Sequence, residues 1–224
     1  MTARGFFVTG TDTGVGKTLV SAALLQLYAG QGLRVVGMKP VAAGREAGRL
    51  NEDVEILRAA ASVEAPPELI NPYAFAPSIA PHIAAQQAGQ RIEIPHVVEC
   101  FERLARDADM VIVEGAGGFL VPLNETETLA DLAVCMHLPV ILVVGMRLGC
   151  LNHALLTVEA IRSRGLKLAG WVANRIDPRM DCLEDNLATL SGRIPAPLLG
   201  AIPPLMSLEN PISISWFIKT PDSN

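Results

Sequence analysis

The stretch Val8-Thr9-Gly10-Thr11-Asp12-Thr13-Gly14-Val15-Gly16-Lys17-Thr18 decides how the rest of this chain is interpreted. It ends an apolar run at residues 5–9, which predicts a β-strand, and opens an apolar run at residues 19–27, which predicts a helix. Glycines let the backbone amides of such a turn point at phosphate oxygens, and the helix start adds its positive dipole end. The final lysine and threonine supply a cation for the phosphates and a hydroxyl for Mg²⁺. The stretch therefore predicts a cradle for Mg-ATP.

This loop is a variant of the strict phosphate-binding pattern. The pattern asks for a glycine five positions before Gly16, but Thr11 stands there and Gly10 lies one step earlier. The Thr11 hydroxyl would lie at the phosphate end of the loop, where it could serve a second substrate. A glycine-rich turn without a ligand is the alternative, although Gly-Lys-Thr placed between a strand and a helix is uncommon by chance.

The composition bounds the class of protein. With 224 residues, 50% of them hydrophobic and 18% charged, the chain can bury one sizeable core, so we expect a single domain over residues 1–224. The net charge of -5 argues against a nucleic-acid or membrane partner, because both favour a basic patch. The most apolar stretch, residues 138–144, is far shorter than the roughly 18 residues of a membrane span. No signal-like segment precedes the first strand, and we therefore expect a cytoplasmic protein.

The cysteines agree with that location. The four of them are widely spaced and lie in otherwise apolar segments. No pair shows the two-residue gap of a metal-binding motif. We expect reduced structural thiols, not metal ligands or disulfides.

Apolar runs rich in valine and isoleucine alternate with longer amphipathic stretches. The runs predict strands covered on both faces, at residues 6–8, 35–38, 111–113, 140–144, 168–173 and 198–202. The stretches between them predict helices at residues 18–31, 94–107, 129–136, 152–164 and 181–191. Their alternation predicts a three-layer α/β fold with a mostly parallel central sheet. Residues 42–90 break the rhythm with many prolines, which predicts an insertion over the sheet edge with helices at residues 51–61 and from Pro81.

Polar residues at strand ends are the candidates for metal binding, because ligands of open parallel sheets bind beyond the carboxyl ends of the strands. Glu114 follows an apolar run and precedes a glycine-rich turn, so it is the first candidate ligand for Mg²⁺. Asp53 and Thr18 are candidates to complete the site, since Mg²⁺ prefers oxygen ligands. A salt-bridged strand end is the alternative for Glu114. From spacing alone, Asp53 could equally cap or solvate its helix.

Further strand-end residues suit phosphoryl transfer and ligand recognition. Lys39 would lie near Lys17, and two lysines suit the negative charge that develops on a transferred phosphoryl group, although Lys39 could also be a solvated strand end. Asn174 could contact a nucleobase or close a turn. The helix start at residues 149–152 could capture a substrate carboxylate with its amides, unless Asn152 is an ordinary N-cap.

With these residues in place, the chain resembles the dethiobiotin synthetases along nearly its whole length up to about residue 204. The segments that carry the resemblance are residues 10–18, 39–41, 81–82, 113–118, 148–154, 170–174 and 195–200. The resemblance implies a P-loop NTPase-like fold, in which a parallel sheet is flanked by helices. It also implies that CO₂ is joined to 7,8-diaminopelargonate with Mg-ATP, through carbamate and carbamic-phosphoric anhydride intermediates. The products would be dethiobiotin, ADP and phosphate, formed in a homodimer with the substrate site at its interface.

The resemblance further implies roles for individual residues. Thr11 and Lys39 would hold the carbamate end of the substrate, and Lys17 would bridge it to the phosphates. The metal would be arranged by Thr18, Asp53 and Glu114. The other nucleotide-binding residues would be Gly14, Val15, Gly16, Leu19, Gly115, Ala116, Gly117, Asn174, Arg175, Pro203, Pro204, Leu205 and Glu209, with Asn174 reading adenine. Further substrate contacts would come from Ala43, Gly149, Cys150, Leu151 and Asn152.

The chain departs from the family pattern at two positions. Ala43 stands where some relatives have a substrate-contacting serine, and Arg175 stands where relatives often have an acidic residue.

Two rival functions share features with this chain. A cobyrinate-type ATP-dependent amide ligase shares the phosphate loop but adds a glutaminase domain, for which 224 residues leave no room. A ParA/MinD-like dimeric switch ATPase would prefer a lysine near Thr11 and a basic face or amphipathic tail. This acidic chain shows neither clearly.

Overall fold

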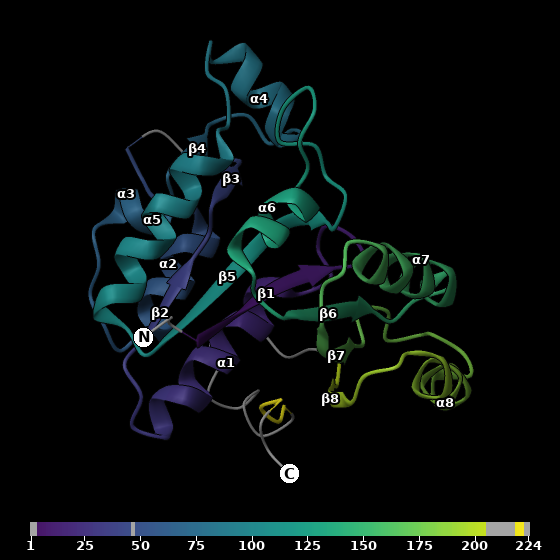
Figure 1. The fold of residues 1–224 in the computed structure, drawn as a ribbon. Coiled ribbons are helices and arrows are strands. Elements are labelled where there is room, and N and C mark those ends of the chain that lie inside the picture. The colour runs from purple at the N-terminus through teal and green to yellow at the C-terminus, as the bar shows by residue number, and fades with distance from the viewer. Residues whose placement is uncertain (1–3, 46–47, 205–217, 222–224) are drawn as a thin grey trace.

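A six-stranded parallel sheet forms the middle layer of the molecule (Figure 1). The computed structural model describes residues 4–45, 48–204 and 218–221. The strand order is β2-β5-β1-β6-β7-β8. Their bounds are β1 Arg4–Gly10, β2 Val35–Met38, β5 Met110–Gly118, β6 Val140–Gly145, β7 Leu168–Asn174 and β8 Leu198–Ile202. Each predicted strand is thus confirmed, as is the α/β class.

Helices cover both faces of this sheet, as the continuous apolar runs require. Helix α1 packs on one face, with α2 beside it, and the other face carries α5, α6, α7 and α8. Their bounds are α1 Lys17–Gly30, α2 Glu52–Ala60, α5 Ile94–Asp107, α6 Leu129–Met136, α7 Cys150–Ser163 and α8 Leu183–Arg193. Successive residues of a strand point to opposite faces, so Phe6 and Val8 pack with α1 while Phe7 packs with α5 and α6.

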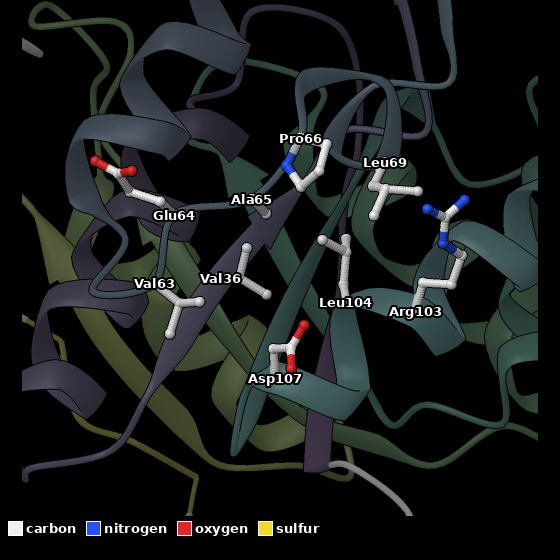
Figure 2. A pocket seen from close by; sticks show the side chains of 9 residues that line it. All are labelled: Val36, Val63, Glu64, Ala65, Pro66, Leu69, Arg103, Leu104 and Asp107. Atoms are coloured by element: carbon white, nitrogen blue, oxygen red, sulfur yellow. The ribbon is translucent and has the colours of Figure 1, made fainter.

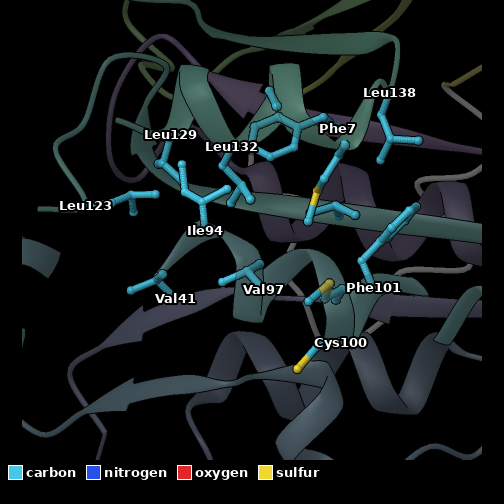
Figure 3. Packing of buried hydrophobic residues seen from close by; sticks show 14 of the residues in the cluster. Phe7, Val41, Ile94, Val97, Cys100, Phe101, Leu123, Leu129, Leu132 and Leu138 are labelled. Atoms are coloured by element: carbon cyan, nitrogen blue, oxygen red, sulfur yellow. The ribbon is translucent and has the colours of Figure 1, made fainter. Parts of the chain in front are cut away.

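The core between the sheet and α5 and α6 is closely packed (Figure 3). Phe7 of β1 lies there with Val97 and Phe101 of α5 and Leu132 of α6, and all four side chains are buried. Burial of such side chains contributes about 1.5–3 kcal/mol each to folding. The central strand β1 is therefore fixed from both faces, which holds the loop at its carboxyl end in place.

The insertion at residues 42–90 contains more regular structure than the sequence predicts. Its predicted helices are confirmed as α2 and as α4 Pro81–Gln87. Three short elements were not predicted, namely β3 Val41–Ala43, α3 Pro67–Ile70 and β4 Tyr73–Phe75. β3 and β4 pair as a small parallel sheet, while α2 and α3 pack against the edge strand β2. Elements of three or four residues are too short to show a hydrophobic period, which is why the sequence pattern missed them.

Two helix starts differ from the prediction. Helix α7 begins at Cys150, and Gly149 is its N-cap with a φ of 93°, so the interpretation of Asn152 as an N-cap is wrong. Helix α8 begins at Leu183, after Cys182 with a φ of 53°, two residues later than the periodicity predicts. In both cases a residue in the left-handed region sets the start, and apolar spacing does not report that conformation.

One small pocket lies beside the amino ends of β2 and β5 (Figure 2). Its side chains include Val36 of β2, Leu69 of α3 and Leu104 of α5. The cavity measures about 30 Å³, which is room for a single water molecule. It lies away from the carboxyl ends of the strands and has no connection with the candidate site. None of the helices within the described ranges combines the length and the apolar composition of a membrane span.

Candidate functional site

The loop between β1 and α1 has the backbone that a phosphate cradle requires. Gly14 and Gly16 adopt φ values of 73° and 91°, which side chains with a Cβ rarely tolerate. A Cβ at Gly16 would also stand 2.3 Å from the Nδ2 atom of Asn174. The two glycines are therefore needed for the conformation, and the second also for the close approach of β7.

Neighbouring strands hold this loop in place. The Thr11 N–H donates to the Val143 carbonyl at 3.0 Å, and the Thr11 hydroxyl accepts from the Gly145 N–H at 3.3 Å. On the other side, the buried Asn174 donates from Nδ2 to the Val15 carbonyl at 2.9 Å. The carboxyl ends of β6 and β7 thus position the loop, and the Asn174 side chain braces the loop in this structure.

A buried cluster of charges lies where α1 begins. Lys39 Nζ donates to Glu114 Oε1 at 2.5 Å and to Asp53 Oδ2 at 2.7 Å. The Thr18 hydroxyl lies 2.8 Å from both Asp53 Oδ1 and Glu114 Oε1. Lys39 is only 4% exposed and Glu114 is fully buried, so the interpretation of Lys39 as a solvated strand end is wrong. Glu114 is salt-bridged, as its alternative interpretation had it, but it lies in the middle of β5 and not at a strand end, and its partner belongs to the cluster.

Asp53 reaches this cluster because α2 is capped by a different residue. The N-cap is Asn51, whose side chain accepts from the Asp53 N–H at 3.1 Å and donates to the Ala43 carbonyl at 3.3 Å. The Asp53 carboxylate is therefore turned toward Thr18 and Lys39, and the interpretation of Asp53 as a cap is wrong. The edge insertion thus contributes one of the two carboxylates.

The two lysines of the site differ in their protonation. Burial lowers the pKa of Lys17 to about 8, and the neighbouring Lys39 ammonium acts in the same direction. Burial also opposes the charge of Lys39, but the attraction of Glu114 and Asp53 outweighs it and raises the pKa of Lys39. For Asp53, burial is again outweighed, here by Lys39, and the pKa is lowered. The cluster therefore keeps Lys39 and Asp53 charged, while Lys17 is the group that most readily loses its proton.

The donor set fits a magnesium ion. Thr18, Asp53 and Glu114 direct oxygen atoms to one place, and oxygen is the ligand type that Mg²⁺ prefers. The buried Glu114 Oε2 has no hydrogen-bond partner within the described part of the chain, so one strong acceptor remains unused. Such an orphaned carboxylate oxygen is costly unless a cation or donor reaches it.

An apolar pocket lies between α8 and the carboxyl ends of β7 and β8. Its volume is about 210 Å³, and its lining includes Met146, Ala173, Arg175, Leu187, Pro203 and Pro204. Three residues predicted to bind the nucleotide thus line one cavity next to Asn174. Arg175 donates to the Pro178 carbonyl at 2.8 Å, and its buried Nε has no partner among the described residues. Leu205 and Glu209, also predicted there, lie outside the described residues.

The residues predicted to bind the substrate lie on two sides of the loop. The start of α7, residues 149–152, follows β6, whose last residue contacts Thr11. At this helix start the Cys150 N–H donates to the Arg147 carbonyl at 3.0 Å, and the His153 N–H donates to the Gly149 carbonyl at 3.3 Å. Ala43 ends β3 on the opposite side. The glycine-rich turn predicted after Glu114 is wrong, because β5 continues through these glycines to Gly118. Gly117, with a φ of 65°, lies in this last part of β5, where a Cβ would stand 3.4 Å from the Thr13 hydroxyl oxygen.

One contact at this site was not predicted from the sequence. Arg147 donates to Asp12 Oδ2 at 2.5 Å and so joins the loop before α7 to the phosphate loop. An acidic residue inside a phosphate-binding loop is a signal that could have indicated a nearby cation. The pairing itself could not be read from the chain, because 134 intervening positions separate the two residues.

A parallel sheet whose first loop has this geometry, with a hydroxyl and two carboxylates beside it, defines a P-loop nucleotide-binding protein. A family model described as an AAA domain matches residues 4–212. The ATP-dependent dethiobiotin synthetase BioD of Nitrosospira multiformis is 56% identical over 200 residues, or 89% of this chain and 88% of the relative. That of Aromatoleum aromaticum is 52% identical over 221 residues, or 97% and 98%. The chain belongs to the ATP-dependent dethiobiotin synthetases and is a P-loop ligase of biotin biosynthesis.

Solved structures confirm the fold. The MinD cell division protein of Aquifex aeolicus has a TM-score of 0.58 at 18% identity, covering 93% of this chain and 86% of that chain. A ParA family ATPase from Chlorobium tepidum has a TM-score of 0.56 at 15% identity, covering 95% and 90%. These likenesses are to the fold alone. The function follows from the relatives with high sequence identity.

Proposed function

We propose that this protein forms the ureido ring of dethiobiotin from 7,8-diaminopelargonate, CO₂ and ATP, and releases ADP and phosphate. The family membership supports the reaction. The observation that carries the residue assignments is the convergence of Lys17, Lys39, Thr18, Asp53 and Glu114 in one buried cluster.

The proposed chemistry has three parts. One amine of the substrate takes up CO₂ as a carbamate and releases a proton. A carbamate oxygen then bonds to the γ-phosphorus of ATP while the bond to ADP breaks, which gives a carbamic-phosphoric anhydride. Finally, the second amine attacks the carbonyl carbon and loses a proton, the bond to the phosphate oxygen breaks, and the ring closes with release of phosphate. Phosphoryl transfer thus turns a poor electrophile into a reactive one.

The protein would contribute charge neutralisation and positioning. Lys17 and Lys39 are both buried, and charges in a site from which water is excluded interact more strongly than charges in water. We assign Lys39 and the Thr11 hydroxyl to the carbamate, and Lys17 to the phosphates that adjoin it. Ala43 lacks a hydroxyl, so its contact with the substrate would be limited to its methyl group and backbone.

Thr18, Asp53 and Glu114 would hold Mg²⁺. An ion bound there would supply positive charge against the oxygens of the β- and γ-phosphates. In the protein alone, the Lys39 ammonium neutralises the same two carboxylates. Lys39 would thus pair with the two carboxylates when no ion is bound, and with the carbamate when the ion is bound.

The nucleotide base would occupy the pocket beside Asn174. Because Asn174 Nδ2 already donates to the loop, its amide oxygen is the atom that we assign to the adenine amino group. Residues 115–117 and the remaining glycines of the loop would contribute backbone contacts to the phosphates, together with Val15 and Leu19. Arg175, Pro203 and Pro204 would form the wall of this pocket.

We also propose a homodimer in which the substrate carboxylate is bound at the start of α7. Leu148 and Leu156 at this helix are 97% and 62% exposed, which is unusual for a pair of large apolar side chains near a site. The six-stranded sheet with its helices, against whose edge the insertion packs, supports a single functional domain over residues 1–224. The four cysteines are unpaired, which supports the cytoplasmic location.

A labelling experiment tests the reaction and its route together. The purified protein is incubated with Mg-ATP, diaminopelargonate and ¹⁸O-labelled bicarbonate, and dethiobiotin and phosphate are analysed by mass spectrometry. We expect dethiobiotin to form and label to enter the released phosphate, because the carbamate oxygen remains on phosphorus. Absence of dethiobiotin would reject the function, whereas dethiobiotin with unlabelled phosphate would reject only the anhydride route. Lys17→Ala serves as the control for ATP-independent background.

A further inference from the structure

Asp12 places a carboxylate inside the loop that we propose to hold a triphosphate. A negative charge at this position repels the phosphates unless another group neutralises it. The described basic side chains that interact with Asp12 are Arg147, His153 and Lys17. Of these, Arg147 contacts the Asp12 carboxylate directly, at 2.5 Å.

The contacts of Asp12 also shape the loop. Its Oδ1 accepts from the Thr13 N–H at 2.7 Å, and its backbone carbonyl accepts from Lys17 Nζ at 2.9 Å. The bond from the Thr13 N–H and the Arg147 guanidinium both lower the pKa of Asp12, so its carboxyl group stays ionised. A change in the orientation of Asp12 would therefore alter both the turn at Thr13 and the place where Lys17 rests.

Arg147 is itself held at a fixed place. Its carbonyl accepts from the Cys150 N–H, and the preceding Met146 N–H donates to the Asn174 carbonyl at 2.7 Å. Arg147 thus stands on a segment anchored to β7 and to α7, and its side chain crosses from there to Asp12. Both side chains are less than half exposed, at 42% and 47%.

We propose that Arg147 is a positioning residue for the nucleotide, which neutralises and orients Asp12 so that the loop accepts a triphosphate. This inference rests on the proposed nucleotide site and adds a residue to it. Arg147 acts through Asp12 and does not contact the phosphates in this role. A surface ion pair without a positioning role contributes little free energy. The effect of Arg147 on nucleotide affinity therefore decides whether the pair positions the loop or has no role.

A double-mutant cycle tests the proposal. Binding of the Mg²⁺ complex of AMPPNP, a non-hydrolysable ATP analogue, is measured by calorimetry for the wild type, Arg147→Met, Asp12→Asn and the double variant. We expect Arg147→Met to weaken binding about tenfold, because Asp12 is left uncompensated beside the phosphates. In the Asp12→Asn background the same change should have little effect. Arg147→Lys should keep most of the affinity, because the charge remains.

Two controls separate positioning from damage to the fold. Arg164→Met removes an ion pair of similar exposure, with Asp131, just after the far end of α7, and should leave AMPPNP affinity unchanged. Adenosine carries no phosphate charge, so its binding should be the same in the wild type and in Arg147→Met. An equal loss for adenosine would overturn the proposal, because it would indicate distortion of the site.

Two further outcomes would overturn it. If Arg147→Met binds AMPPNP as tightly as the wild type, the ion pair has no role in nucleotide binding. If Arg147→Met weakens binding equally with Asp12 or Asn at position 12, Arg147 acts on the phosphates directly. Failure of the underlying site is distinguishable, since the wild type would then not bind AMPPNP and Lys17→Ala would make no difference.

Discussion

Lys17 and Lys39 are both buried lysines of the same site, yet their surroundings drive their pKa values in opposite directions. Lys17 is buried and forms no ion pair with a carboxylate in the part of the chain that the structure describes, and burial lowers its pKa to about 8. Lys39 is buried between Asp53 and Glu114, and its pKa rises. Burial alone does not set the charge of a residue, because the balance between lost hydration and nearby charges decides it.

Lys17 should therefore make the protein alone less stable at neutral pH. Its folded pKa lies below the usual 10.5, so between pH 8 and 10.5 the unfolded chain holds more protons and stability rises with pH. Below pH 8 Lys17 is protonated in both the folded and the unfolded state, and the folded state carries the full free-energy cost of burying this charge. Lys17→Met should stabilise the protein at pH 7 by up to about 3 kcal/mol and remove this pH dependence. Urea unfolding at pH 7 and 9.5, with EDTA and without nucleotide, measures both effects.

The exposed Lys167 provides the matched control for that experiment, since Lys167→Met should leave stability and its pH dependence unchanged. A loss of stability in Lys17→Met at pH 7 would contradict the prediction. A gain accompanied by loss of turnover would mark Lys17 as a residue kept for function at a cost to stability.

Lys39→Met should change how the protein responds to divalent ions. The substitution leaves two carboxylates without their buried cation, so the protein without metal should lose about 3 kcal/mol of stability. It should also bind Mg²⁺ or Mn²⁺ without nucleotide about tenfold more tightly, because no ammonium competes for the oxygens. Calorimetric titration and melting curves with and without Mg²⁺ measure this, and an unchanged ion affinity would show that Lys39 does not compete.

At the level of elements, α2 positions one side of the site. Asn51 caps the helix and ties it to β3, and this contact turns the Asp53 carboxylate toward Thr18. The other end of α2 is tied to β2, where the Val35 N–H donates to the Ser62 hydroxyl at 2.9 Å. The amino end of α2 thus lies at the candidate site, and its carboxyl end lies away from the site.

Asn51→Ala should therefore affect both stability and function. Loss of the N-cap should cost about 1 kcal/mol, and the freed helix start should raise the Mg²⁺ concentration needed for half-maximal turnover. Ser62→Ala removes two hydrogen bonds at the other end of α2, with the Val35 N–H and the Leu33 carbonyl, and should leave the Mg²⁺ requirement unchanged. If both variants shift that requirement equally, the effect comes from general destabilisation and not from the position of Asp53.

At the level of the whole molecule, the order of the strands assembles the site. β1 lies between β5 and β6, so the loop after β1 meets Glu114 on one side and the start of α7 on the other. All paired strands of this sheet are parallel, so their carboxyl ends meet at one edge. Residues far apart in the chain thus become neighbours around a single loop.

The proposed homodimer should depend on the exposed face of α7. Leu156→Asp places a charge on this face and should convert the dimer to a monomer, with a raised KM for diaminopelargonate. Leu198→Asp alters another exposed leucine, 38% exposed at the amino end of β8, and should leave the dimer intact. Analytical ultracentrifugation measures the mass. A wild type that sediments as a monomer with full activity would refute the dimer.

Much of the fold could be predicted because its signals are local. The strands at residues 35–38 and 198–202 and the helices at residues 94–107 and 129–136 coincide with β2, β8, α5 and α6. The sequence could not predict β3, β4 and α3. These elements have only three or four residues and are stabilised by pairing and packing with distant segments, not by a local hydrophobic pattern. Asn71 shows this dependence, since its side chain donates to the carbonyls of Lys39 and Tyr73 and holds the insertion against β2.

The sequence by itself determined the alternation of strands and helices, the phosphate loop, and the residue types at the strand ends, because each depends on neighbours within a few positions. Only the tertiary structure decided that Lys39 lies buried between Asp53 and Glu114, that Asn174 braces the loop, and that Arg147 meets Asp12. These contacts join residues from different strands, and charge, burial and distance act through space. The order of residues along the chain gives their charges but not their burial or the distances between them.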